Sequence, residues 1–208
     1  MPTFAFTYVL IALNVLMSVL AWNNANFMQK WIFHPVSIAR NGDYWRFLTS
    51  GFIHSDGMHL FFNMFALFSF GLNVEFNLVL RYGEMGRYLL LVIYLLAIVA
   101  SDLPSYFKYK KDMYYSALGA SGAVSAMIFA SIYFAPLSKI SLYFIPIPGF
   151  IFGVLYLAYC SYMVKNAKDN IGHDAHFYGS VFGFFSALLL YPAGVDTFIT
   201  QIGSFKLF

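Results

Sequence analysis

Ser121 and His176 are the two residues of this 208-residue chain whose side chains could together attack a peptide bond. A serine hydroxyl is a weak nucleophile until a neighbouring base accepts its proton, and histidine, with an ordinary pKa near 6.5, is the usual base. Both residues lie in apolar stretches, where a polar group is costly and is a candidate for function. Small residues surround the serine in Gly119-Ala120-Ser121-Gly122, so a substrate backbone could approach it closely. We therefore predict a catalytic Ser121–His176 dyad.

His59 and Asn63 could stabilise the oxyanion that forms when the hydroxyl attacks a carbonyl carbon. Imidazole and amide side chains can donate to an oxyanion beside backbone N–H groups. The two residues are four apart, so on a helix they share one face. The alternative for each is an ordinary hydrogen bond between helices.

The two acidic residues near the expected helix ends are given structural roles. Asp174 is two residues from His176, so the two side chains do not face each other on a helix, and we expect Asp174 to cap the start of the last span. Asp102 is expected to be an interfacial group at the end of the third span. The sequence therefore favours a dyad without a carboxylate.

A metal site is the main rival chemistry. Several side chains could supply nitrogen or oxygen ligands, namely His54, His59, His173, His176 and Asp174. The zinc-protease pattern H-E-x-x-H is absent, because His54 and His59 are five apart with no glutamate between them. Cys160 is the single cysteine, which excludes an intramolecular disulfide and a cysteine-based zinc site, and we interpret it as a small buried hydrophobe. We expect no metal site.

The composition indicates a membrane protein. Apolar residues make up 61% of the chain, aromatic residues 21% and charged residues only 10%, against about 25% charged in soluble domains. The net charge of +3 comes from scattered basic residues, which does not indicate a nucleic-acid surface or a polybasic tail. With no linker, repeat or low-complexity tract, residues 1–208 are expected to form one membrane domain.

Six stretches are long and apolar enough to approach the roughly 20 residues that a membrane-spanning helix needs. The sequence therefore predicts an all-α, polytopic fold. The first stretch lacks a basic leader and a small-residue cleavage site, so we interpret it as a span rather than a signal peptide. The fifth contains Pro146, Pro148 and Gly149, so its helix should begin near Phe150. The stretches are Phe4–Trp22, Met58–Val74, Arg87–Leu103, Leu118–Ala135, Ile140–Val164 and Asp174–Tyr191.

The long segment between the first two spans, residues 23–57, mixes aromatic and polar residues. This mixture is typical of the membrane interface, although an ordinary aqueous loop is the alternative. A short tail, residues 193–208, follows the last span. The aromatic residues of the long segment are Trp31, Phe33, Trp45, Phe47 and Phe52.

The candidate catalytic residues converge on one side of the membrane. They occur near the N-terminal ends of spans two, four and six, and successive spans alternate in direction. Small residues then recur at four-residue spacing in spans four and six, which allows two helices to approach closely in lipid. These two series are Gly122–Ala126–Ala130 and Gly179–Gly183–Ala187.

The basic residues do not agree with a cytoplasmic N-terminus. That orientation would place four basic residues inside and eight outside, together the 12 of the chain, which favours the opposite orientation. The inside set would be Arg81, Arg87, Lys139 and Lys206, and the outside set Lys30, Arg40, Arg46, Lys108, Lys110, Lys111, Lys165 and Lys168.

Taken together, the motifs resemble those of the rhomboid family of intramembrane proteases, from about Trp45 to Gly183. The chain has a Trp45-Arg46 pair and Phe52-x-His54, followed by the H-x-x-x-N pattern of His59 and Asn63. Gly71 and Glu75 also match. The nucleophile motif G-x-S-G and the motif A-H-x-x-G-x-x-x-G occur in the same order as in the family, at Gly119-Ala120-Ser121-Gly122 and at Ala175-His176-x-x-Gly179-x-x-x-Gly183.

The resemblance implies a six-helix rhomboid bundle with Ser121 as nucleophile, His176 as general base and then acid, and no cofactor. His59, Asn63 and Ser121 would form the oxyanion site. Structural support would come from Trp45, Arg46, Gly119, Gly122, Gly179 and Gly183.

The resemblance also implies substrates that are single-span membrane proteins, cleaved near the ends of their transmembrane helices, and partners that include the lipid bilayer but neither nucleic acid nor metal. It further implies a multi-pass protein of a bacterial-type inner or plasma membrane, with a cytoplasmic N-terminus and an extracytoplasmic active site. One departure is Ser125, where several relatives have an aromatic residue that packs on the catalytic histidine; other aromatic residues could substitute here.

Two other functions fit parts of the pattern. A rhomboid-like protein could bind membrane clients without cleaving them, although such proteins usually lack the serine and histidine that this chain retains. A small transporter is disfavoured because the polar groups gather near one face instead of forming a path through the bilayer.

Overall fold

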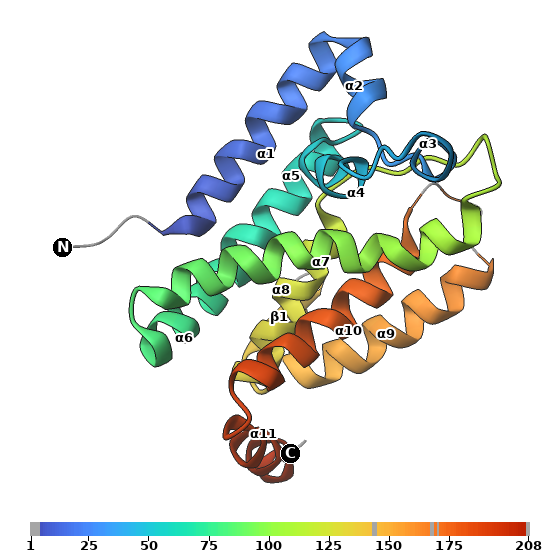
Figure 1. Ribbon diagram of the computed structural model, residues 1–208. Coiled ribbons are helices and arrows are strands. Elements are labelled where there is room, and N and C mark those ends of the chain that lie inside the picture. The colour runs from blue at the N-terminus through green and yellow to red at the C-terminus, as the bar shows by residue number, and fades with distance from the viewer. Residues whose placement is uncertain (1–4, 143–144, 167–168, 170, 207–208) are drawn as a thin grey trace.

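The computed structural model describes residues 5–142, 145–166, 169 and 171–206. Some residues named in the predictions lie outside this description. They are Phe4 of the first stretch, residues 143–144 of the fifth stretch, Lys168 of the basic residues and Phe208 of the tail. Figure 1 shows the described helices packed side by side, with the short C-terminal helix set across the end of the bundle.

Each of the six predicted stretches contains a helix. They correspond in order to α1, α5 with α6, α7, α8, α9 and α10. A π-helical turn at Leu67–Gly71 joins α5 to α6, and a 3₁₀ turn at Ser50–Phe52 precedes α5. The helices are α1 Phe6–Asn23, α2 Ala25–Trp31, α3 Pro35–Asn41, α4 Arg46–Thr49, α5 Gly57–Ala66, α6 Leu72–Tyr82, α7 Met85–Tyr109, α8 Ser121–Phe134, α9 Gly149–Asn166, α10 His173–Leu190 and α11 Gly194–Ser204.

The helices confirm the all-α membrane class. Within the described ranges, three helical segments are long and apolar enough to cross a membrane, namely α1, the continuous Gly57–Tyr82 segment and α7. A fourth span is possible if α10 and α11 count as one, although the chain bends by 119° between them. The predicted count of six is compatible with this arrangement but approximate, because α8 has only 14 residues.

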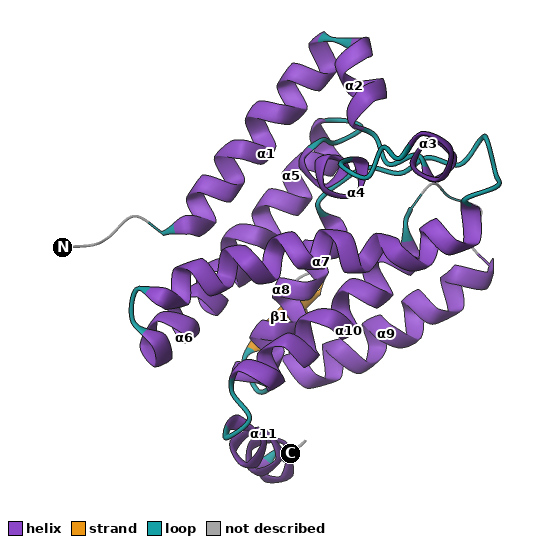
Figure 2. Cartoon of the chain, in the orientation of Figure 1, coloured by secondary structure: helices purple, strands orange, loops and turns teal. Residues whose placement is uncertain are grey.

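The fifth stretch is only partly helical. Its first residues form a two-stranded antiparallel hairpin, β1 Lys139–Leu142 with β2 Ile145–Pro148, drawn in orange in Figure 2. The helix α9 then begins at Gly149, one residue before the predicted start at Phe150. The prolines exclude the hairpin segment from the helix, as predicted, but the pairing itself was missed.

The interfacial segment of residues 23–57 is folded and has a small core of its own. Phe33, Ile38 and Phe47 are buried together under α7. The Arg46 guanidinium binds Asp43 at 3.1 Å and donates to the carbonyls of Gln29 and Ile32, each at 2.9 Å. Trp45 is 48% exposed despite its large ring, and the interfacial position of this segment stays a prediction.

Glu75 anchors the start of α1. Its carboxylate accepts hydrogen bonds from the backbone of Phe6 at 2.7 Å and of Thr7 at 2.9 Å, and from the Thr7 hydroxyl at 2.6 Å. These N–H groups have no partner inside their own helix, and a negative charge is favourable at a helix N-terminus. A side chain of α6 therefore caps α1 and fixes the two spans to each other.

The helix α8 lies in the middle of the bundle and touches α10 through backbone. A Cβ atom added to Gly179 would lie 2.1 Å from the Gly122 carbonyl oxygen, and one added to Gly183 would lie 2.1 Å from the Ala126 carbonyl oxygen. The predicted small-residue ridges therefore meet each other. Close packing of this kind drives helix association in lipid, where the hydrophobic effect between helices is lost.

Gly183→Ala is expected to destabilise the fold by about 1–3 kcal/mol, because the added methyl group must force α8 and α10 apart. Gly203→Ala on α11 is the matched control, since nothing lies within 4 Å of its added Cβ. The control should be neutral or slightly stabilising, because alanine favours a helix more than glycine does. Thermal unfolding in detergent measures both. An unchanged Tm for Gly183→Ala would contradict the close contact.

Candidate active site

The chain reaches Ser121 through a strained glycine. Gly119 has φ +119°, a conformation that favours glycine, and its N–H donates to the Ser50 carbonyl at 2.9 Å. A Cβ added to Gly119 would lie 2.6 Å from Cε1 of His59. The glycine thus lets the His59 ring lie directly against the segment that precedes the serine.

His54 supports the same segment, whereas from the sequence it had only a place in a motif and among the possible metal ligands. Its side chain is fully buried, and Nε2 accepts a hydrogen bond from the Ala120 N–H at 3.4 Å. Its Nδ1 lies 2.9 Å from the Ser18 hydroxyl. Because Nε2 accepts, the neutral ring carries its proton on Nδ1 and donates to Ser18. His54 therefore links α1 through hydrogen bonds to Ala120, the residue before Ser121.

The neutral form of His54 is stable over the physiological range. Burial, followed by the proximity of His59, lowers the pKa of His54 from 6.5 to about 3. A ring that stays neutral keeps its acceptor nitrogen for Ala120. The signal that could have revealed this role is the Phe52-x-His54 motif, but spacing alone does not say which backbone group the ring reaches.

His59 and Asn63 both lie on α5, as predicted. The Asp56 side chain caps this helix by accepting from the His59 N–H at 2.9 Å, and the Ser55 hydroxyl lies 3.1 Å from His59 Nδ1. The buried Asn63 amide donates to the His59 carbonyl at 2.9 Å. An amide nitrogen has two hydrogens, so this bond uses one of the two.

An aromatic ring from α9 lies beside His176. Tyr156 lies parallel to His176, with 6.4 Å between ring centroids and 21° between planes. The Tyr156 hydroxyl is 3.2 Å from the Ser125 hydroxyl. Ser125 therefore leaves space for Tyr156 and also binds it. From the sequence, another aromatic residue was expected to substitute for the ring that is absent at Ser125, but Tyr156 was not identified as that residue.

The α8–α10 contact places the residues next to Ser121 and His176 against each other. Gly122 follows Ser121, and a Cβ on it would lie 3.5 Å from the carbonyl oxygen of Ala175, which precedes His176. Within the described ranges, the Ser121 hydroxyl and the His176 ring make no direct hydrogen bond. Catalytic hydrogen bonds are often long before substrate binds, so the arrangement still suits a nucleophile and a base.

Asp174 and Asp102 both differ from expectation. Asp174 is not a helix cap, because α10 begins one residue earlier at His173. Its carboxylate accepts from the Ser105 hydroxyl at 2.7 Å, which turns it toward α7, and from the Ala175 N–H at 2.9 Å. Asp102 lies inside α7, which continues to Tyr109, and its carboxylate is 3.5 Å from the Ser50 hydroxyl.

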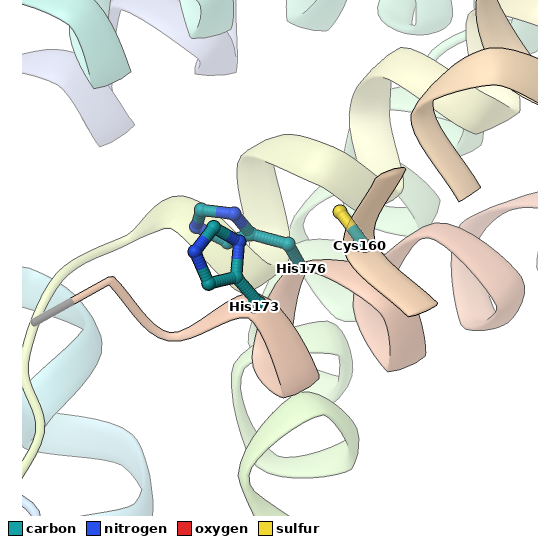
Figure 3. Close-up of side chains that lie close together, drawn as sticks. All are labelled: Cys160, His173 and His176. Atoms are coloured by element: carbon teal, nitrogen blue, oxygen red, sulfur yellow. The ribbon is translucent and has the colours of Figure 1, made fainter. Parts of the chain in front are cut away.

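Only some of the possible metal ligands named from the sequence lie close to one another. His54 packs against His59 with 4.9 Å between ring centroids, and His173 lies 6.2 Å from His176. Among the described residues, the group of three close enough to hold a metal consists of Cys160, His173 and His176, drawn in Figure 3.

The chain is similar to several known proteins. Over 190 residues, 89% of this chain, it is 32% identical to the rhomboid protease GluP of Bacillus subtilis. It is 25% identical over 166 residues, 76% of the chain, to the mitochondrial RHOMBOID-like protein 12 of Arabidopsis thaliana. It is 32% identical over 107 residues, 46% of the chain, to the rhomboid protease AarA of Providencia stuartii.

These relatives are longer proteins. The matches cover 34%, 49% and 36% of their lengths, so the chain spans between a third and a half of each. The family model of the Rhomboid domain matches residues 41–193. This range includes the second half of the interfacial segment and every helix from α4 to α10. The chain therefore belongs to the rhomboid family, in which two of these three relatives are named as proteases.

Proposed function

We propose that the protein is an intramembrane serine endopeptidase in which Ser121 attacks the substrate carbonyl and His176 accepts the serine proton. The observation that carries the proposal is the backbone contact of α8 with α10 beside both residues. His176 would then return the proton to the leaving amine, as a general acid. The reaction needs no cofactor, because the serine, the histidine and water supply all the atoms that it uses.

The position of Ser121 at the start of a short helix supports cleavage within the membrane. With 14 residues, α8 is about 21 Å long, against a hydrocarbon core of about 30 Å. If its other end reaches one membrane surface, Ser121 lies roughly 10 Å below the opposite one. Substrates would accordingly be single-span membrane proteins, cleaved near the ends of their transmembrane helices.

His59 and Asn63 are proposed as oxyanion donors together with the backbone N–H of Ser121. The contact of His59 with Gly119 supports this role, because it places an imidazole beside the nucleophile segment. Trp45 and Arg46 are proposed to support the site from the interfacial segment, and Gly119, Gly122, Gly179 and Gly183 by allowing close approach.

Ser121→Ala and His176→Ala are expected to abolish cleavage of single-span substrates in liposomes, a loss of more than about 10⁴-fold, because the nucleophile or its base is removed. Ser69→Ala is the matched control, since in the described part of the chain the Ser69 hydroxyl donates to the Phe65 carbonyl one turn earlier, at 3.1 Å. Equal cleavage by all variants would contradict the dyad. No cleavage by the wild type would favour the client-binding protein.

Asn63→Ala is expected to lower kcat by about 10²–10³-fold with little change in KM, because the donor acts on charge that develops in the transition state. Asn166→Ala is the control, since its amide makes the same bond to a carbonyl four residues earlier, at 2.8 Å. Initial rates at several substrate densities separate kcat from KM. Wild-type turnover in Asn63→Ala would remove the residue from the oxyanion site.

Tyr156 is proposed as a positioning residue for His176. Tyr156→Leu should lower kcat by roughly 10–100-fold, because a small misplacement of a catalytic group is costly, whereas Tyr156→Phe keeps the ring and most of the rate. Adding Ser125→Phe to Tyr156→Leu supplies a ring from α8 and should restore activity. If the added ring fails to rescue a stably folded variant, the stacking role is wrong.

The active face is proposed to point away from the cytoplasm in a bacterial-type inner or plasma membrane. Lys108 lies in the last turn of α7, before the segment that leads to Ser121, and Lys139 lies in β1, which follows the C-terminal end of α8. In a Cys160→Ala background, a cysteine at Lys108 should react with an impermeant reagent added outside intact cells, and one at Lys139 should not. The reverse pattern would place the site on the cytoplasmic side.

A further inference from the structure

Cys160, His173 and His176 form a cluster at the junction of α9 and α10. Each offers one ligand atom, and these atoms all lie within 4.8 Å of one another (Figure 3). His173 and His176 are one helical turn apart on α10, and Cys160 comes from the neighbouring α9. Only His176 has a part in the proposed reaction. The cluster as a whole therefore calls for a separate explanation.

The burial and hydrogen bonding of His173 resemble those of a histidine that binds a metal. It is only 3% exposed, and its Nδ1 is buried with no hydrogen-bond partner among the residues that the structure describes. Its Nε2 lies 3.2 Å from the Asp169 carboxylate. In the neutral ring, Nε2–H donates to Asp169 and the lone pair is left on Nδ1. Histidines that bind metals typically donate their other ring nitrogen to a carboxylate in this way.

The donor set suits zinc. A thiolate and two imidazoles favour Zn²⁺ over Mg²⁺ or Ca²⁺, which prefer oxygen ligands. Tetrahedral zinc with bonds of about 2.0–2.3 Å holds its ligands about 3.5 Å apart, so small side-chain rotations would close the cluster. A water molecule would complete the four ligands.

The charges of such a site would balance in apolar surroundings. Zinc binding displaces the thiol proton of Cys160, which leaves one negative charge on sulfur. The Asp169 carboxylate supplies a second negative charge next to His173. Together they neutralise the two positive charges of Zn²⁺, which removes most of the cost of burying an ion.

We propose that Cys160, His173 and His176 bind one Zn²⁺ ion and that this binding switches off the protease. The inhibitory part rests on the proposed function, because it requires His176 to be the base. When zinc occupies one nitrogen of a neutral imidazole, the ring proton must sit on the other. His176 then has no lone pair left to accept the Ser121 proton, whichever nitrogen the metal takes.

The proposal departs from the sequence-based expectation of no metal site. That expectation treated the lone cysteine and the histidines separately, and it set aside a cysteine-based zinc site because the chain has a single cysteine. A mixed site needs only one cysteine when a second helix supplies the histidines.

Binding is tested with Co²⁺ as a spectroscopic substitute for Zn²⁺, on the full chain in detergent. The wild type should bind about one Co²⁺ per chain with a thiolate-to-cobalt absorption band that Zn²⁺ abolishes. Cys160→Ala should lose the band, whereas His34→Ala, outside the cluster, should keep it. Ser121→Ala should also keep it, so this readout decides on the site even if the protein is not a protease.

Inhibition is tested by cleavage in liposomes with Zn²⁺ added and then chelated. Wild-type cleavage should stop reversibly, and Cys160→Ala, compared with its own zinc-free rate, should need more than about 100-fold more Zn²⁺ for half-inhibition. Asp169→Asn should need about 10–100-fold more, the usual effect of an outer-shell partner. Absence of the cobalt band in folded wild type would overturn the site, and its persistence in Cys160→Ala would do the same. Bound zinc without inhibition would overturn the switch alone.

Discussion

The backbone contact between α8 and α10 is the constraint on which the rest of the structure depends. At Gly179 and Gly183 there is no room for a side chain, because the carbonyl oxygens of α8 occupy that space. Two helices in lipid gain little from excluding water, so this packing must supply much of their attraction. The same contact determines how far apart Ser121 and His176 lie, so stability and the proposed chemistry share one interface.

The start of α8 depends on the interfacial segment in the same direct way. Phe33 and Ala117 form an antiparallel bridge, Gly119 donates to Ser50, and Ala120 donates to His54. Irregular backbone at membrane depth needs such partners, since lipid offers none. The segment between the first two spans is therefore bonded to the residues that precede Ser121, the proposed nucleophile.

Much of the fold and of the candidate site could be predicted because it has a local signal. Apolar length predicted the helices, Pro146 and Pro148 predicted the late start of α9, and four-residue spacing predicted the small-residue ridges. The hairpin, the Tyr156–His176 stack and the contact of Asp174 with Ser105 depend on pairings between distant segments. No periodicity in the sequence encodes such a pairing, so these features could be recognised only in three dimensions.

The helix α9 carries the parts of the site that sequence motifs did not reveal. Tyr156 and Cys160 are one turn apart on it, so both face α10, where the first stacks on His176 and the second lies in the cluster proposed to bind zinc. Because one rigid helix carries both side chains, a shift of α9 against α10 must change the ring contact and the sulfur distance together. The ring beside His176 thus comes from α9, whereas Ser121 comes from α8.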